Sequence, residues 1–185
     1  MGADVALGEF RMSFVSTLVR ASRLGAAAGY CGLSLAALTP SSQAADKDLL
    51  TVGAGAYDVM HKNDATAAFQ LEYLSGRKLW VFNPFAGLMG TLDSAVYGYG
   101  GIALDLKLSD HWLLTPSFAA GIYARGDGRD LGSPLEFRSA IALNYQFDNG
   151  VRAGLQFYHL SNAGLTDQNP GTEVLLATYG IPLGR

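Results

Sequence analysis

The feature that most constrains the fold of this chain is a strict alternation of apolar and polar side chains. It is clearest from Leu135 to Phe147, where Phe137, Ile141 and other apolar residues alternate with polar residues such as Glu136 and Arg138. Successive side chains of a β-strand point to opposite faces, so this alternation predicts a strand with one apolar face. No stretch shows a sustained helical period, and the chain is therefore expected to be all-β.

Seven other segments repeat the pattern, and turn-type residues separate them. Between the sixth and seventh of these strands, Asp148-Asn149-Gly150 is a strong signal for a tight hairpin. In the third strand, Asn83-Pro84 predicts a bulge or bend, because proline cannot donate to the ladder. The eight expected strands are Leu50–Val59, Thr66–Ser75, Leu79–Gly90, Ala95–Lys107, His111–Tyr123, Leu135–Phe147, Val151–Ser161 and Thr172–Leu183.

Residues 1–44 are expected to be a cleavable export signal. Three arginines precede the apolar run Leu24–Leu38, and the small-x-small pattern Ser42-Gln43-Ala44 follows it. A membrane anchor is the alternative, although the run falls short of the ~20 residues that a spanning helix needs. Met12 is an alternative start. The single cysteine, Cys31, lies in this segment, so the mature domain, residues 45–185, is expected to contain no disulfide.

Two architectures fit eight alternating strands: a soluble barrel or sandwich with the apolar face inside, and an outer-membrane barrel with that face against lipid. The export signal favours the antiparallel eight-stranded outer-membrane β-barrel. Charges on the polar face could pair inside such a barrel, which is too narrow for a pore: Glu72, Asp105, Glu136, Arg138 and Arg152. Aromatic residues near strand ends suit the interfacial girdles: Tyr73, Trp80, Trp112, Tyr145, Phe147 and Phe157.

A base, a hydroxyl and a carboxylate lie at neighbouring strand ends. His159 and Ser161 share one strand face, roughly 6.6 Å apart, and continue its apolar side. If the last two strands form a hairpin, Glu173 begins its strand nearby on the same face. A serine nucleophile needs such a base, and the base needs a third group to orient it. Asn162 and the Gly164 backbone N–H are candidate oxyanion donors. A hydrogen-bonded cluster with a purely structural role is the alternative.

Strand direction predicts where these groups lie. Bacterial barrels have short periplasmic turns and longer outer loops. With a periplasmic N-terminus, the strand that ends at Ser161 runs outward, and the loop Asn162–Gly171 is extracellular. His159, Ser161 and Glu173 would then face lipid at the level of the outer leaflet. A hydrolase at that position is expected to act on a lipid of that leaflet, which in a Gram-negative outer membrane is lipopolysaccharide.

The same residues carry a resemblance to a known family. The sequence His159-Leu160-Ser161-Asn162-Ala163-Gly164, followed by Asn169-Pro170-Gly171 and Glu173, resembles the signature of the outer-membrane lipid A 3-O-deacylases (PagL type). The resemblance implies hydrolysis of the ester-linked 3-O acyl chain of lipid A, without a metal or organic cofactor. It also implies that His159 is the general base, Ser161 the nucleophile and Glu173 the orienting acid, with Asn162 and Gly164 at the oxyanion hole.

Other functions have less support. The mature chain has 14 acidic and 10 basic residues, which excludes a nucleic-acid footprint. We expect His61 and His111 to be surface histidines without a carboxylate at metal-ligand spacing. By the alternation of turns we place Arg125 and Arg129 at the periplasmic end and Lys62 outside. Lipid A and other outer-membrane lipids are the expected partners, and a homodimer is left open. The alternatives are a structural or adhesion barrel and a soluble barrel that binds an apolar ligand.

Overall fold

The computed structural model describes residues 47–61 and 65–184. The expected signal segment and the alternative start at Met12 lie outside the described residues. No helix in the described part of the chain is long and apolar enough to cross a membrane.

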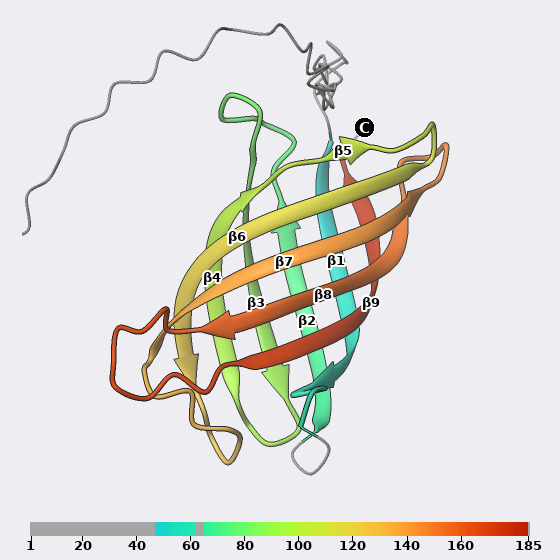
Figure 1. Ribbon diagram of the computed structural model, residues 1–185. Helices are drawn as coiled ribbons and strands as arrows, with labels where there is room; N and C mark the ends of the chain where they lie inside the picture. Colours follow the sequence, from blue (N-terminus) through green and yellow to red (C-terminus); the bar gives the residue numbers. More distant parts are fainter. Residues whose placement is uncertain (1–46, 62–64, 185) are drawn as a thin grey trace, which may run out of the picture. The chain divides into compact units, whose positions relative to one another are not determined.

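The described chain forms a closed antiparallel β-barrel (Figure 1). Strands that are consecutive in sequence pair with each other except β4 and β5, β9 pairs with β1, and β4 pairs with β6 to complete the closure. β4 and β5 are two parts of one interrupted strand, since both pair with β6, and the barrel is therefore eight-stranded, as predicted. The strands are β1 Asp48–Tyr57, β2 Thr66–Leu74, β3 Asn83–Thr91, β4 Val96–Ala103, β5 Leu106–Lys107, β6 Trp112–Ala124, β7 Leu135–Gln146, β8 Arg152–Ser161 and β9 Thr172–Leu183.

Two strands depart from the prediction, and a proline lies near each departure. The Leu104 N–H donates to the Pro116 carbonyl at 3.0 Å, but Pro116 has no N–H to return the bond, and the ladder breaks between β4 and β5. Pro84 was expected within the third strand at a bulge or bend. It is instead the second residue of β3, paired with Ile102, because β3 begins four residues later than predicted. A turn replaces the predicted start.

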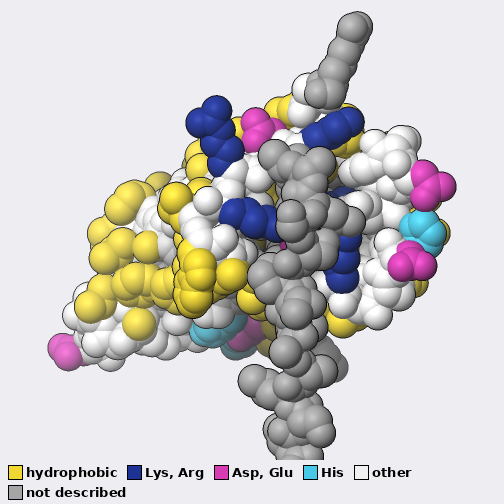
Figure 2. Space-filling model, turned by 90° about the horizontal axis from the view of Figure 1, so that it is seen from above, with side chains coloured by type: hydrophobic (Ala, Val, Ile, Leu, Met, Phe, Trp, Pro, Cys, Tyr) yellow, Lys and Arg dark blue, Asp and Glu magenta, His cyan; other side chains and the backbone are white. Residues whose placement is uncertain are grey.

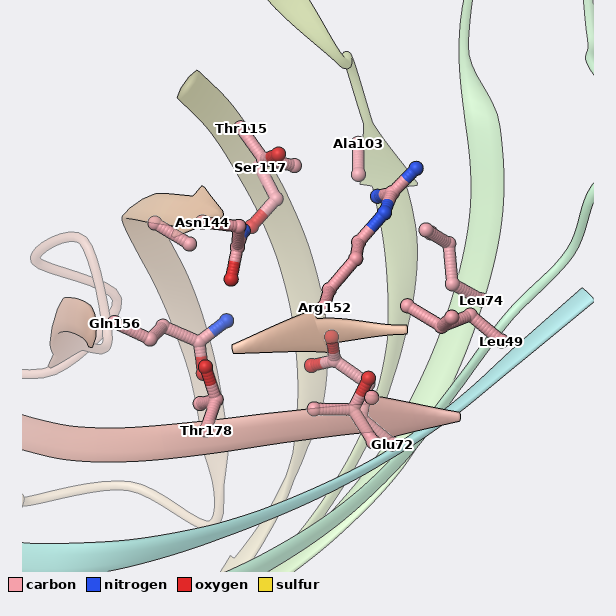
Figure 3. Close-up of a pocket in the computed structure, with 13 residues that line it drawn as sticks. Leu49, Glu72, Leu74, Ala103, Thr115, Ser117, Asn144, Arg152, Gln156 and Thr178 are labelled. Carbon is pink, nitrogen blue, oxygen red and sulfur yellow. The ribbon is translucent and has the colours of Figure 1, made fainter. Parts of the chain in front are cut away.

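The inside of the barrel is polar and nearly filled. Arg138 is fully buried, lies 3.3 Å from Glu72, and stacks over three aromatic rings, Phe85, Tyr99 and Tyr158. A second ion pair among the charged residues of the polar face joins Arg152 to Asp105 at 2.8 Å. Figure 3 shows Arg152, Glu72, Gln156 and Thr178 around a cavity of about 40 Å³, which is room for one or two water molecules. Such an interior is a plug and no pore.

The outside of the barrel is apolar, which rules out the soluble alternative. Along β9, Val174 and Leu176 are fully buried, whereas Leu175 and Tyr179 are exposed by 43% and 48%. An apolar exterior of this extent marks a surface that faces lipid. Figure 2 shows hydrophobic side chains gathered on the flank of the barrel. Further exposed members of this surface are Val52, Phe69, Leu71, Leu88, Ile102, Phe118, Ile122, Ile141, Leu143, Leu155 and Ile181.

The two ends of the barrel differ. The turn end carries the short connections 75–82, 108–111 and 147–151, and an aromatic cluster lies there, in which Tyr145 contacts His111, Trp112 and Phe147. The loop end carries residues 58–61, 92–95, 125–134 and 162–171 (Figure 1).

The expectation that Arg125 and Arg129 lie at the opposite end of the barrel from the loop Asn162–Gly171 was wrong. Both belong to the 125–134 loop at the loop end, where Arg129 Nη1 donates to Asp58 at 2.9 Å. β6 occupies the fifth strand position and runs in the same direction as β8, so the segments that follow these two strands emerge together. Lys62 lies outside the described residues.

Candidate active site

Strand register brings His159 and Glu173 together. His159 on β8 lies directly opposite Glu173 on β9, and its Nδ1 is 3.1 Å from Glu173 Oε1. The imidazole is 44% exposed and the carboxylate 20% exposed. Tyr158 and Leu160, the neighbours of His159 in the chain, are fully buried. Both polar side chains therefore lie on the outer face of the barrel, in line with the exposed apolar side chains of β8 and β9.

Ser161 completes the predicted set at the last residue of β8. It is partly buried, lies opposite Phe137 of β7, and shares the outer face with His159 because the two are two residues apart. The order along this face is therefore carboxylate, imidazole, hydroxyl, which is the order required to activate a serine. The Glu173 contact on Nδ1 leaves Nε2 as the ring atom available to a hydroxyl.

Gly171 determines where the imidazole can lie. A Cβ at this position would be 2.6 Å from His159 Cε1 and 3.2 Å from Nε2, and the residue has a φ of +62°. Residue 171 precedes Thr172, which pairs with Leu160, so Gly171 lies beside the end of β8 where Ser161 is. The Nε2 side of the ring is thus turned toward the end of the strand that carries Ser161.

Replacing Gly171 by alanine is expected to lower kcat on an ester substrate by at least about tenfold, because the added methyl displaces the ring from its near-attack position. Gly150→Ala is the matched control: φ is +86° there, and a Cβ would meet only Pro182 at 3.5 Å, at the turn end. Both variants share the backbone strain, so steady-state kinetics of the two isolate the contact with His159. Equal kcat in both variants would contradict this role.

The two candidate oxyanion residues hold the loop that follows β8. Asn162 is fully buried, and its Nδ2 donates to the carbonyls of Leu131 at 3.0 Å and Gln168 at 2.7 Å. Its Oδ1 accepts the Gly164 N–H at 2.9 Å. Both predicted donors thus have partners within the protein. The backbone between them is strained, since Ala163 has a φ of +55° and Gly164 of +77°.

A charged cluster that sequence reasoning missed lies beside Glu173. Asp58 is fully buried and binds His61 Nδ1 at 2.7 Å and Arg129 Nη1 at 2.9 Å. The expectation that His61 has no carboxylate neighbour was wrong. The spacing Asp58-x-x-His61 could have indicated this pair, but no local signal joins either residue to Arg129, 71 positions from Asp58. His111, at the turn end, has an exposed ring, as expected of a surface histidine.

The cluster has ligand atoms for a metal cation, but it already contains the positively charged guanidinium of Arg129. Ligand atoms of Asp58, His61 and Glu173 lie within 4.8 Å of one another, a spacing that can hold a metal ion. The Arg129 guanidinium, however, already binds Oδ2 of Asp58 and supplies positive charge at that carboxylate. We therefore assign no metal to it.

Comparisons with known proteins show the family of this chain. Residues 65–182 match the family model described as "Lipid A 3-O-deacylase (PagL)". The chain is similar to the lipid A deacylase PagL of Pseudomonas aeruginosa, with 40% identity over 55 residues, which are 30% of this chain and 32% of that protein. It is also similar to the lipid A deacylase PagL of Bordetella bronchiseptica, with 37% identity over 49 residues, 26% of this chain and 28% of that protein. The matched segments thus span about a third of the length of these relatives.

Among solved structures, the barrel is similar to the crystal structure of the outer membrane enzyme PagL, with a TM-score of 0.59 and 19% identity over 73% of this chain and 99% of that one. It is also similar to a de novo designed transmembrane β-barrel, with a TM-score of 0.50 and 13% identity over 76% of this chain and 98% of that one. These two likenesses concern the fold. The family model covers more than half of the sequence, and the chain therefore belongs to the lipid A 3-O-deacylase (PagL) family.

Proposed function

We propose that this protein hydrolyses the ester-linked 3-O acyl chain of lipid A in the outer membrane. The observation that carries the proposal is an imidazole fixed by a carboxylate on the lipid-facing wall of the barrel, His159 Nδ1 to Glu173 Oε1 at 3.1 Å, with Ser161 two residues along the same face. Polar groups with this chemistry are costly on a surface that meets lipid. Family membership supplies the substrate class.

In the proposed reaction, Ser161 Oγ attacks the carbonyl carbon of the ester while His159 Nε2 takes the hydroxyl proton. Glu173 holds the Nδ1–H tautomer and stabilises the imidazolium that forms. The tetrahedral intermediate collapses, and the bond between the acyl carbon and the sugar oxygen breaks. His159 gives its proton to that departing oxygen, which becomes a free hydroxyl. Water then attacks the acyl-enzyme by the same route and releases the fatty acid, so the net reaction consumes one water molecule.

The oxyanion donor in this proposal is the Gly164 N–H, and Asn162, whose buried amide donates to the Leu131 and Gln168 carbonyls, holds the loop that carries it. Since the Gly164 N–H donates to Asn162 Oδ1 in the free protein, it would have to share or exchange that bond when the oxyanion forms. The backbone at Ala163 is strained, and a small local rearrangement there would release the Gly164 N–H. The reaction needs no metal or organic cofactor, because nucleophile, base and acid are side chains of this chain.

We further propose that the loop end of the barrel lies in the outer leaflet. Lipid A would then reach Ser161 by lateral diffusion, with its acyl chains along exposed apolar side chains of β8 and β9 such as Leu155 and Leu175. The aromatic cluster at the turn end, which includes Trp112, Tyr145 and Phe147, suits the opposite interface.

Mass spectrometry of lipid A tests the function directly. Cells that express the wild type are expected to lose one 3-hydroxyacyl chain from position 3, and cells that express Ser161→Ala are expected to keep it. Comparable amounts of folded protein in outer-membrane fractions are the control. Identical lipid A in both strains, together with no acyl release by purified wild type from lipid A in detergent micelles, would instead favour a structural or adhesion barrel.

A further inference from the structure

The buried carboxylate of Asp58 connects three segments at the loop end. It accepts hydrogen bonds from His61 Nδ1 after β1, from Arg129 Nη1 in the 125–134 loop, and from Thr172 Oγ1 at the start of β9, at 2.7, 2.9 and 3.1 Å. Asp58 itself is completely shielded from solvent and has a φ of +60°. A non-glycine residue keeps such a backbone conformation only where the surroundings enforce it.

One of these bonds, together with a backbone bond, fixes the segment that carries Glu173. Thr172, the residue before Glu173, donates its hydroxyl to Asp58, and the Val59 N–H donates to the Glu173 carbonyl at 3.1 Å. The first two residues of β9 are thus held by the two residues that follow β1. The height of Glu173 on the barrel wall, and with it the reach to His159, depends on this junction.

The same cluster sets the electrostatic surroundings of Glu173. A carboxylate oxygen of Asp58 and one of Glu173 lie within 4.8 Å of each other, so the two carboxylates repel each other. Glu173 Oε2 is buried and has no hydrogen-bond partner among the described residues. Arg129 opposes this repulsion, because it binds Asp58 Oδ2 and its own side chain is only 19% exposed. His61 binds the other oxygen of Asp58.

We propose that Asp58 and Arg129 are positioning residues that keep the Glu173 carboxylate directed at His159. Arg129 neutralises Asp58, and Asp58 holds the start of β9, so that the second carboxylate is available to orient the imidazole. The inference deepens the proposed function and rests on it for its kinetic test, whereas the orientation of His159 can be measured without any substrate.

The kinetic test is a double-mutant cycle. Arg129→Met removes the charge and keeps much of the side-chain volume. It is expected to lower kcat by about tenfold or more with a smaller change in KM, because the unpaired carboxylate of Asp58 then repels Glu173 from its position beside His159. Arg129→Met combined with Asp58→Asn removes both charges and is expected to regain part of the lost kcat. Arg129→Lys keeps the charge and is expected to retain kcat within about threefold, and Arg129→Gln replaces Arg129→Met if that variant does not fold.

The matched control is the other partly buried arginine–aspartate pair, at 2.8 Å between Arg152 and Asp105 in the lumen. Arg152→Met is expected to lower stability without this loss of kcat. A purely structural role for Arg129 predicts that Arg129→Met and Arg152→Met change stability and kcat alike. It also predicts that the double variant Arg129→Met with Asp58→Asn has a lower kcat than either single variant.

The second readout is the tautomer of His159. The chain has three histidines, so ¹⁵N-histidine NMR of the detergent-solubilised protein can be assigned with His61→Gln and His111→Gln. The wild type is expected to carry the His159 proton on Nδ1, and Arg129→Met is expected to shift His159 toward the Nε2–H form. A wild type that releases no fatty acid would refute the proposed function alone. An unchanged His159 tautomer in Arg129→Met, or a double variant no faster than the single one, would overturn the positioning role.

Discussion

His159→Gln is expected to lower kcat on lipid A by about 10³-fold or more, because glutamine cannot take the proton of Ser161 and Glu173 lies on the Nδ1 side of the ring, away from Nε2. Glutamine keeps a polar side chain of similar reach, and His159 is half exposed on the barrel wall, so the fold is expected to survive. Initial rates of fatty-acid release from lipid A in mixed micelles measure the loss. His111→Gln, at the turn end, is the control and is expected to leave the rate unchanged.

The stronger form of this prediction concerns additivity. If Ser161 and His159 act as one unit, Ser161→Ala, His159→Gln and the double variant are expected to have nearly the same residual rate, since either change removes the whole covalent route. Folding is checked in each case by the migration of the unheated barrel in a detergent gel. Independent, multiplying losses would show that the two residues do not share one step, and the proposed triad would have to be abandoned.

Local sequence pattern predicted those parts of the structure that depend on the pleat of a strand. The alternation from Leu135 to Phe147 predicted which side chains face outward, and the same alternation in β2 and β7 placed Glu72 and Arg138 on the polar face, where they meet across the lumen. The contact between His159 and Glu173 was predictable for the same reason, because a hairpin of two strands fixes which residues lie opposite each other.

Contacts between loops were not predictable in this way. Arg129 meets Asp58, and Asn162 meets Leu131, across 71 and 31 residues, and no periodicity relates these positions. The sequence suggested that Asn162 is a free donor because it follows Ser161, but alternation continues for one more residue and turns its side chain inward, where it is completely buried. The break between β4 and β5 depends on Pro116, which lies on the partner strand and affects the ladder there.

Glu173→Gln is expected to lower kcat by roughly 10²- to 10⁴-fold, because a carboxamide can present its NH₂ group to His159 Nδ1 and so favour the Nε2–H tautomer, which cannot accept the Ser161 proton. The effect belongs in kcat, with KM nearly unchanged, since Glu173 acts on the ring and does not bind the acyl chain.

Glu136→Gln is the matched control for this change. Glu136 is a fully buried carboxylate on β7, its side chain points into the barrel, and the described structure gives its oxygens no hydrogen-bond partner. The same replacement of a carboxyl group by a carboxamide there is expected to leave kcat within about threefold of the wild type, since Glu136 has no contact with His159. Equal rates for Glu173→Gln and Glu136→Gln would mean that the 3.1 Å contact holds the barrel wall together and takes no part in proton transfer.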